Sequence, residues 1–216
     1  MEANFWHAKW ENGEIGFHLG AVNSLLLEHF RALSLNSGDR VFVPLCGKTR
    51  DIGWLLESGY RVVGVELSPV AVEQLFVELG VAPNIDQAGL LTHFSTEGID
   101  IYSGDVLALT ANQLGPVDAV YDRAALVALP EAMRQSYVAH LGAITGRASQ
   151  LLITYDYDQT LQHGPPFALS SDEVCELYGR DYDLELLASI EITGGLRGIC
   201  QATEHVWRLT MNSPED

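Results

Sequence analysis

The sequence has few cysteines and no long uncharged apolar run. Its three cysteines, Cys46, Cys175 and Cys200, are odd in number and far apart, so neither a disulfide framework nor a zinc site can be assembled from them. No apolar stretch approaches the roughly 20 residues that cross a bilayer, and the first residues do not read as a secretory signal. We therefore expect a cytoplasmic protein with no metal site.

Basic residues are also scarce. Twelve Lys and Arg stand against 29 Asp and Glu, which gives a formal net charge of −17. Proteins that bind nucleic acid or anionic membranes present clustered basic residues to the phosphates, and this chain has no such cluster. Both partners are therefore disfavoured, although acidic residues also simply keep a protein soluble. We expect a small neutral or weakly acidic substrate and a monomer.

Length and composition fit one folded domain. The 216 residues are 47% hydrophobic and 19% charged, enough apolar content to bury a sizeable core. Neither a repeat nor a long linker divides the chain, so we predict a single domain over residues 1–216. Residues 1–36 are predicted to form an aromatic-rich arm and a helix that cover the site, and residues 37–216 the core.

The most informative segment is residues 40–69. Residues 41–45 and 62–65 are apolar runs rich in β-branched side chains, an amphipathic segment separates them, and Glu66 ends the second run. This order predicts a strand, a crossover helix and a parallel strand with a carboxylate at its carboxyl end. Ligands of open parallel sheets bind there, and a carboxylate about 20 residues after the first turn can hold ribose hydroxyls. The alternative is that Glu66 is an ordinary solvated acid.

The turn after the first strand distinguishes between nucleotide ligands. Of the three glycines in a dinucleotide fingerprint it has only Gly47, and a phosphate-binding loop would need glycine where Phe42 stands. Pro44 also removes a backbone donor, so a phosphate nest cannot form. The turn favours a nucleoside without phosphate, and S-adenosylmethionine is the leading candidate.

Several blocks of the sequence resemble a known family. They read FWHAKWENGEIGFH, FVPLCGKTRDIGWLLESGYRVVGVELS, YDRAALVAL and GPPF. In these blocks and their spacing the chain is similar to bacterial members of the thiopurine S-methyltransferase family. The resemblance implies an S-adenosylmethionine-dependent methyltransferase that acts on the sulfur of aromatic and heterocyclic thiols. The alternatives are methylation of selenium, tellurium or halide species for detoxification, and a non-catalytic nucleoside-binding protein.

The rest of the chain completes an expected α/β fold. Alternating apolar residues at 184–192 and 207–211 predict an antiparallel pair, while the polar residues 81–98 are predicted to lie outside the core. We predict a seven-stranded, mostly parallel sheet flanked by helices, the Rossmann-like fold of class I methyltransferases. Further strands are predicted at residues 99–102, 119–121 and 151–155.

Helix starts are visible at two places. Ser68 is a good N-cap residue, and Pro69 suits the first helical position. A second helix is predicted to start at Pro130. Its buried stripe is expected to contain Met133, Tyr137, Leu141 and Ile144.

Five residues are candidates for the cofactor site. The resemblance places Trp10 and the backbone of Leu45 against the cofactor, and Glu66 on the ribose. Asp105 and Val106 follow the third strand, where this fold meets the adenine with an acid and an apolar neighbour. The alternative for Asp105 is a cap or turn residue.

The expected substrate residues are Arg123 and Phe17. Arg123 follows the fourth strand and is expected to meet the cofactor carboxylate or the substrate thiolate, unless it pairs locally with Asp122. The resemblance places Phe17 near the substrate. No general base is assigned, because thiols on electron-poor heterocycles are acidic; His18 and Arg197 are weaker candidates for the site. The pocket after the fifth strand is expected to contain Tyr155, Asp156 and residues 164–167.

Overall fold

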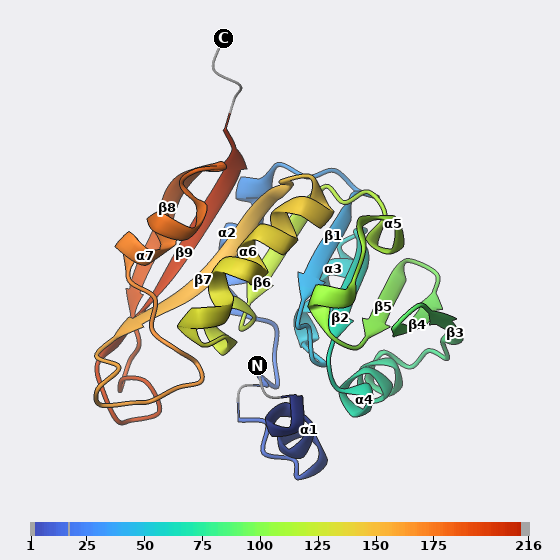
Figure 1. Ribbon diagram of the computed structural model, residues 1–216, viewed down its shortest axis with the longest axis horizontal. Coiled ribbons are helices and arrows are strands. Elements are labelled where there is room, and N and C mark those ends of the chain that lie inside the picture. The colour runs from blue at the N-terminus through green and yellow to red at the C-terminus, as the bar shows by residue number, and fades with distance from the viewer. Residues whose placement is uncertain (1–2, 17, 213–216) are drawn as a thin grey trace. The chain divides into compact units, whose positions relative to one another are not determined.

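The computed structural model describes residues 3–16 and 18–212, and Figure 1 shows its helices and strands. The chain divides into two compact units, Met1–Ala119 and Val120–Asp216. A single domain over residues 1–216 therefore stays a prediction. No helix within the described ranges has the length and apolar character that a membrane crossing requires.

The first unit contains the predicted strand–helix–strand arrangement. β1 (Arg40–Pro44) is followed by α3 (Arg50–Glu57), β2 (Arg61–Glu66) and α4 (Pro69–Leu79). β2 pairs in parallel with both β1 and β5 (Ile99–Ser103), and the strand order in this unit is β3-β4-β5-β2-β1. All residues of β1 and β2 except the first of each are buried, as inner strands of a parallel sheet require.

The described residues form nine strands, whereas seven were predicted. The difference arises at residues 81–98, where an antiparallel hairpin of β3 (Asn84–Ala88) and β4 (Leu91–Thr96) replaces the predicted excursion. β4 also pairs with β5. Only Leu91 and Phe94 of the two hairpin strands are buried, and Phe94 stacks on Phe76 of α4 with ring centroids 6.1 Å apart. Two buried side chains are too few to produce a strand pattern in the sequence.

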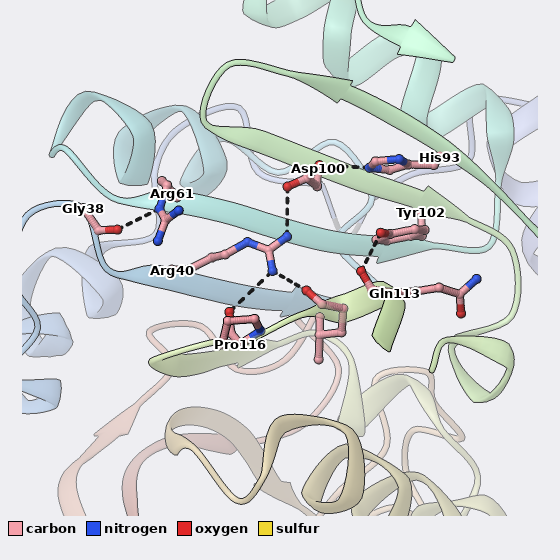
Figure 2. Close-up of polar contacts among 9 residues, drawn as sticks. Gly38, Arg40, Arg61, His93, Asp100, Tyr102, Gln113 and Pro116 are labelled. Atoms are coloured by element: carbon pink, nitrogen blue, oxygen red, sulfur yellow. Dashed lines mark hydrogen bonds and ion pairs between the residues drawn. The ribbon is translucent and has the colours of Figure 1, made fainter. Parts of the chain in front are cut away.

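Polar contacts hold the amino ends of the first unit's parallel strands (Figure 2). Arg40, at the start of β1, donates from Nη2 to Oδ2 of Asp100 on β5 at 2.9 Å, and from Nη1 to the carbonyl oxygens of Leu114 and Pro116. The second oxygen of Asp100 lies 2.9 Å from Nε2 of His93 on β4. These contacts lie at the edge of the sheet opposite the carboxyl ends, where the candidate ligand residues follow β1, β2 and β5.

The amino-terminal arm is helical. α1 (Ala3–Glu11) contacts α4, and α2 (Ser24–His29) continues into the 3-10 turn η1 (Phe30–Leu33). Oδ1 of Asn23 caps α2 by accepting from the amides two and three residues further on. The predicted helix after the arm is thus confirmed, although its second half is a 3-10 turn.

The second unit contains long antiparallel strands, in the order β6-β7-β9-β8. β9 (Ala202–Met211), red in Figure 1, pairs antiparallel with two strands. These are β7 (Ser149–Tyr157), drawn in amber, and β8 (Tyr182–Glu191), drawn in orange. This confirms the predicted antiparallel pair. α6 (Glu131–Thr145) contacts α7 (Ser171–Tyr178). The remaining short elements of the two units are η2 (Val106–Ala108), α5 (Ala111–Leu114), β6 (Ala119–Arg123) and η3 (Leu126–Ala128).

Candidate active site

Glu66 ends β2 with its side chain buried. Only 6% of its surface is exposed, which excludes an ordinary solvated acid. Oε2 accepts from the amide of Gly47 and Oε1 from the amide of Ser68, each at 2.8 Å. Burial raises the pKa of this carboxyl, and backbone donors, led by Ser68, act in the opposite direction. A carboxylate has about four acceptor sites, so two amides leave capacity for a pair of ligand hydroxyls.

The turn after β1 uses its backbone amides within the chain. The amide of Cys46 donates to a β2 carbonyl at 3.0 Å, and that of Thr49 donates back to Cys46 at 3.2 Å. The amide of Gly47 is bonded to Glu66. A phosphate-binding loop needs such amides to point at its ligand. Three amides of the turn are therefore bonded within the chain and Pro44 has none, which supports the prediction that this turn does not cradle phosphate.

Leu45 adopts a left-handed backbone conformation with φ 46°. For a residue other than glycine this costs on the order of 1–3 kcal/mol and persists only where the surroundings hold it. Strained residues of this kind cluster at ligand-binding sites. The conformation supports the expected backbone role of Leu45 toward the cofactor, and that role stays a prediction.

Trp10 connects the arm to the same turn. Gly47 has φ 53°, a conformation that glycine adopts without steric cost. A Cβ at this position would lie 3.0 Å from Cζ2 of Trp10, so the indole packs directly on the glycine. Trp10 is only 5% exposed. The structure therefore brings Trp10, the turn and Glu66 together, because the amide of Gly47 donates to the Glu66 carboxylate.

Asp105 and Val106 follow β5, the next strand along this edge. The amide of Gly104 donates to the backbone carbonyl of Glu66 at 2.8 Å, which brings the ends of β5 and β2 together. The exposed side chain of Asp105 accepts from the amide of Leu107 at 3.0 Å and caps η2, while Val106 is buried. The capping role is thus observed. A role of Asp105 and Val106 at the adenine stays a prediction.

Arg123 ends β6 in the second unit. Its Nε is buried and has no hydrogen-bond partner among the described residues, and its charge opposes the effect of burial, which raises the pKa of the Tyr155 hydroxyl. The preceding Asp122 is fully buried. It accepts from the hydroxyl of Tyr137 at 2.7 Å and from the amide of Leu126 at 3.1 Å. Both of its oxygens are thus bonded elsewhere, which argues against the local ion pair with Arg123.

Burial raises the pKa values of several acidic groups of the second unit, Asp122 and Tyr155 among them. Burial raises the pKa of Asp122 to about 6, against the opposing effect of the Tyr137 hydroxyl and two backbone amides. Burial, followed by the charge of Glu204, raises the pKa of Tyr155 to about 12. Tyr155 therefore keeps its proton at neutral pH, and Asp122 is closed off from solvent. Neither group suits a general base for a thiol.

Phe17 and Arg197 are two further candidates from the sequence. Phe17 is outside the described residues. Nη2 of Arg197 donates to the carbonyl of Pro165 at 2.8 Å, and the hydroxyl of Tyr157 donates to the carbonyl of Pro166 at 2.6 Å. Arg197 therefore holds the diproline segment that was expected to shape the substrate pocket.

Sequence reasoning missed two residues beside the candidates. A Cβ on Gly64 of β2 would lie 2.9 Å from Sγ of Cys46, so the turn packs against a position that only glycine can fill. Glycine inside a strand pattern is a signal of such close approach. Glu204 lies opposite Tyr155 in the β7–β9 pair. Nothing in the sequence indicates this register, because it joins segments far apart in the chain.

Comparison with known proteins identifies the family. The family model for thiopurine S-methyltransferases matches residues 1–212. The chain belongs to the thiopurine S-methyltransferase family. A thiopurine S-methyltransferase of Xanthobacter autotrophicus is 55% identical over 210 residues, which cover 97% of this chain and 99% of that protein. One of Teredinibacter turnerae is 48% identical over 212 residues, with 98% and 99% covered. The expected enzyme class, an S-adenosylmethionine-dependent methyltransferase, is confirmed.

Solved structures agree on the fold of this thiopurine S-methyltransferase family member. A 1,6-didemethyltoxoflavin-N1-methyltransferase of Burkholderia thailandensis, bound to its substrate and S-adenosylhomocysteine, has a TM-score of 0.65 at 16% identity, over 96% of this chain and 87% of that one. A TehB-like S-adenosylmethionine-dependent methyltransferase of Corynebacterium glutamicum has a TM-score of 0.58 at 14% identity, over 97% and 98%. Both likenesses confirm the expected methyltransferase fold.

Proposed function

We propose that this protein transfers the methyl group of S-adenosylmethionine to the sulfur of aromatic and heterocyclic thiols, thiopurines among them. A thiolate sulfur bonds to the methyl carbon while the bond from that carbon to the sulfonium sulfur breaks. The products are a methyl thioether and S-adenosylhomocysteine. Relatives named thiopurine S-methyltransferase, at 55% and 48% identity over nearly the whole chain, support this substrate class.

A buried carboxylate beside a turn that cannot cradle phosphate is the observation that carries this assignment. The two ribose hydroxyls of a nucleoside match the spare acceptor capacity of Glu66. A dinucleotide or a triphosphate would need backbone donors for its phosphates, and the amides of Cys46, Gly47 and Thr49 already donate within the chain. The residues proposed to bind the cofactor are Trp10, Leu45, Glu66, Asp105, Val106 and Arg123.

The substrate side depends on ionising a thiol. Methyl transfer from a sulfonium needs alignment and exclusion of water rather than covalent help from the protein. Free thiols have a pKa near ~8.5, and thiols on electron-poor heterocycles are more acidic. A nearby guanidinium favours the thiolate further, and Arg123 has a buried donor without a partner among the described residues. We propose Arg123 and Phe17 as the substrate residues, with no general base required.

A label-transfer assay tests the function. The purified protein is incubated with S-adenosylmethionine labelled in its methyl group and with a mercaptopurine, a thiophenol, a selenol or iodide. We expect label in the organic thiols and an equal amount of S-adenosylhomocysteine. Transfer only to the selenol or iodide would replace thiols by small soft nucleophiles as substrates. Absence of transfer with intact S-adenosylhomocysteine binding would mean a non-catalytic nucleoside-binding protein.

A binding control separates the nucleoside site from the reaction. Calorimetric titration with S-adenosylhomocysteine, NAD and ATP should show binding of the first compound alone. Tight binding of NAD or ATP would overturn the assignment of a site without provision for phosphate.

A further inference from the structure

Three polar side chains form a row across neighbouring strands of the second unit. Arg123 ends β6, Tyr155 lies in β7 and Glu204 lies in β9, and these strands are adjacent in the order β6-β7-β9. Tyr155 and Glu204 are direct partners in the antiparallel β7–β9 pair, so their side chains lie on the same face. After burial, both neighbours act on the pKa of Tyr155, since Glu204 raises it and Arg123 lowers it, which places both groups within interaction range of the Tyr155 hydroxyl.

The chemistry of the three groups fixes the direction of hydrogen bonding between them. A guanidinium only donates, so the oxygen of Tyr155 can only accept from Arg123. An ionised carboxylate only accepts, so the hydroxyl of Tyr155 can only donate to Glu204. The hydroxyl keeps its proton at neutral pH, because the pKa of Tyr155 is raised to about 12. The row therefore favours a single orientation, in which Tyr155 presents its oxygen to Arg123.

This arrangement holds Arg123 without neutralising it at close range. In strand order the group next to Arg123 is the neutral hydroxyl of Tyr155 on β7, and the carboxylate of Glu204 is one strand further away on β9. A direct ion pair with a carboxylate would neutralise the positive charge of Arg123 that attracts an anionic ligand. The Nε of Arg123 is buried and has no partner among the described residues, and buried donors are rarely left in this state unless a ligand uses them.

We propose that Tyr155 and Glu204 are positioning residues that hold the Arg123 guanidinium for the substrate thiolate, an inference that rests on the proposed thiol methylation. Neither residue needs to touch the substrate, because both act through Arg123. The row also determines specificity. Thiols of higher pKa depend on it more, because they ionise less readily without a fixed positive charge nearby.

A double-mutant cycle tests this proposal. kcat/KM is measured with an acidic heterocyclic thiol and with a less acidic thiol for the wild type, Tyr155→Phe, Arg123→Ala and the double variant. We expect Tyr155→Phe to lower kcat/KM about tenfold for the less acidic thiol, to lower it less for the acidic one, and to have almost no further effect in the Arg123→Ala background. Equal losses in both backgrounds, or equal losses for both thiols, would overturn the positioning role.

A second variant tests the far end of the row. Glu204→Gln leaves an acceptor for Tyr155 but adds a competing donor, so the hydroxyl loses its single orientation. We expect a loss of kcat/KM of about threefold that also disappears in the Arg123→Ala background. Glu191→Gln is the matched control, because it removes an exposed carboxyl from β8, and it should leave kcat/KM unchanged. A loss from Glu204→Gln that persists without Arg123 would remove Glu204 from the proposal.

Two measurements keep the outcomes distinguishable. Thermal unfolding and the Kd for S-adenosylhomocysteine show whether each variant is folded and still binds the cofactor product. We expect both to match the wild type in Tyr155→Phe and Glu204→Gln, and we expect weaker binding in Arg123→Ala, because Arg123 is also proposed to bind the cofactor. A wild type that binds S-adenosylhomocysteine but transfers no methyl group would overturn the proposed function together with the row. An active wild type with an additive cycle would overturn the row alone.

Discussion

Glu66 has a structural role, and we propose a ligand-binding role for the same side chain. Its carboxylate satisfies two buried backbone amides, those of Gly47 and Ser68, and has acceptor capacity left for a ribose. Removing the carboxylate altogether would leave both amides unpaired, at about 1–3 kcal/mol each. A test of ligand binding therefore needs a substitution that keeps an acceptor.

We predict that Glu66→Gln weakens the binding of S-adenosylhomocysteine at least tenfold, which is about 1.4 kcal/mol. The glutamine oxygen can still accept from one amide, but the charge-assisted hydrogen bonds to the ribose, worth about 1.5–3 kcal/mol each, are lost. Calorimetric titration measures the effect. Glu73→Gln, which changes an exposed carboxyl on α4, is the control and should bind normally. Unchanged affinity in Glu66→Gln would remove Glu66 from the site.

The sequence predicts the positions of single residues better than their partners. Ser68 stands at the N-cap of α4 as expected, but its side chain makes no capping hydrogen bond and its amide binds Glu66 instead. Met133 was expected to belong to the buried stripe of α6, but Arg134 is buried in its place. Arg134 pairs with Glu173, a partner in α7 that helical spacing within α6 cannot reveal.

At the scale of elements, the sequence predicts strands well where burial is continuous. Every residue of β1 and β2 after the first is buried, and both strands were predicted. The β3–β4 hairpin was not predicted, because β3 is exposed and β4 buries only two side chains. The contact of α1 with the turn after β1 is also invisible in the sequence, since it depends on how Trp10 packs on Gly47.

We predict that Gly47→Ala destabilises the protein more than Gly13→Ala. Both glycines have a left-handed φ, 53° and 68°, which costs about 1–2 kcal/mol for alanine. Only at Gly47 would the added methyl meet a neighbour, Trp10 at 3.0 Å, and such overpacking adds about 1–3 kcal/mol. Urea unfolding measures the difference.

The same pair of variants tests the docking of the arm. Because Trp10 packs beside the amide that binds Glu66, Gly47→Ala should also weaken S-adenosylhomocysteine binding, whereas Gly13→Ala should not. Equal free energies of unfolding and equal affinities would show that α1 does not depend on this contact.

At the scale of the whole molecule, the candidate residues divide between the two units. The residues proposed for the nucleoside lie in the first unit, and the row of Arg123, Tyr155 and Glu204 lies in the second. The sequence showed no such division, because no linker or change of composition marks the boundary. The net charge of the whole chain is −17. One of its buried acids, Asp122, has a raised pKa, and we expect it to affect the pH dependence of stability.

We predict that Asp122 makes the folded protein less stable as pH rises from about 4 to 6. The pKa of Asp122 is raised from the usual 3.8 to about 6, so the folded chain holds a proton in this window that the unfolded chain releases. Stability therefore falls with rising pH, by at most about 3 kcal/mol. Asp122→Asn cannot ionise, so its free energy of unfolding relative to the wild type should increase across this window.

Denaturant unfolding of both proteins at pH 4, 5, 6 and 7 measures this difference. The other carboxyls contribute nearly equally to both proteins and cancel when one curve is subtracted from the other. A difference that stays constant from pH 4 to pH 7 would show that folding does not raise the pKa of Asp122.

The donors that orient Glu66 are main-chain amides, one from the turn after β1 and one from the start of α4. Every amino acid except proline supplies such a group. Genetic variation at positions 47 and 68 can therefore alter packing and strain, but only a mutation to proline abolishes a donor outright. The orientation of the proposed ribose acceptor therefore depends on the backbone, and it tolerates changes in the neighbouring side chains that a network built from side-chain donors would not survive.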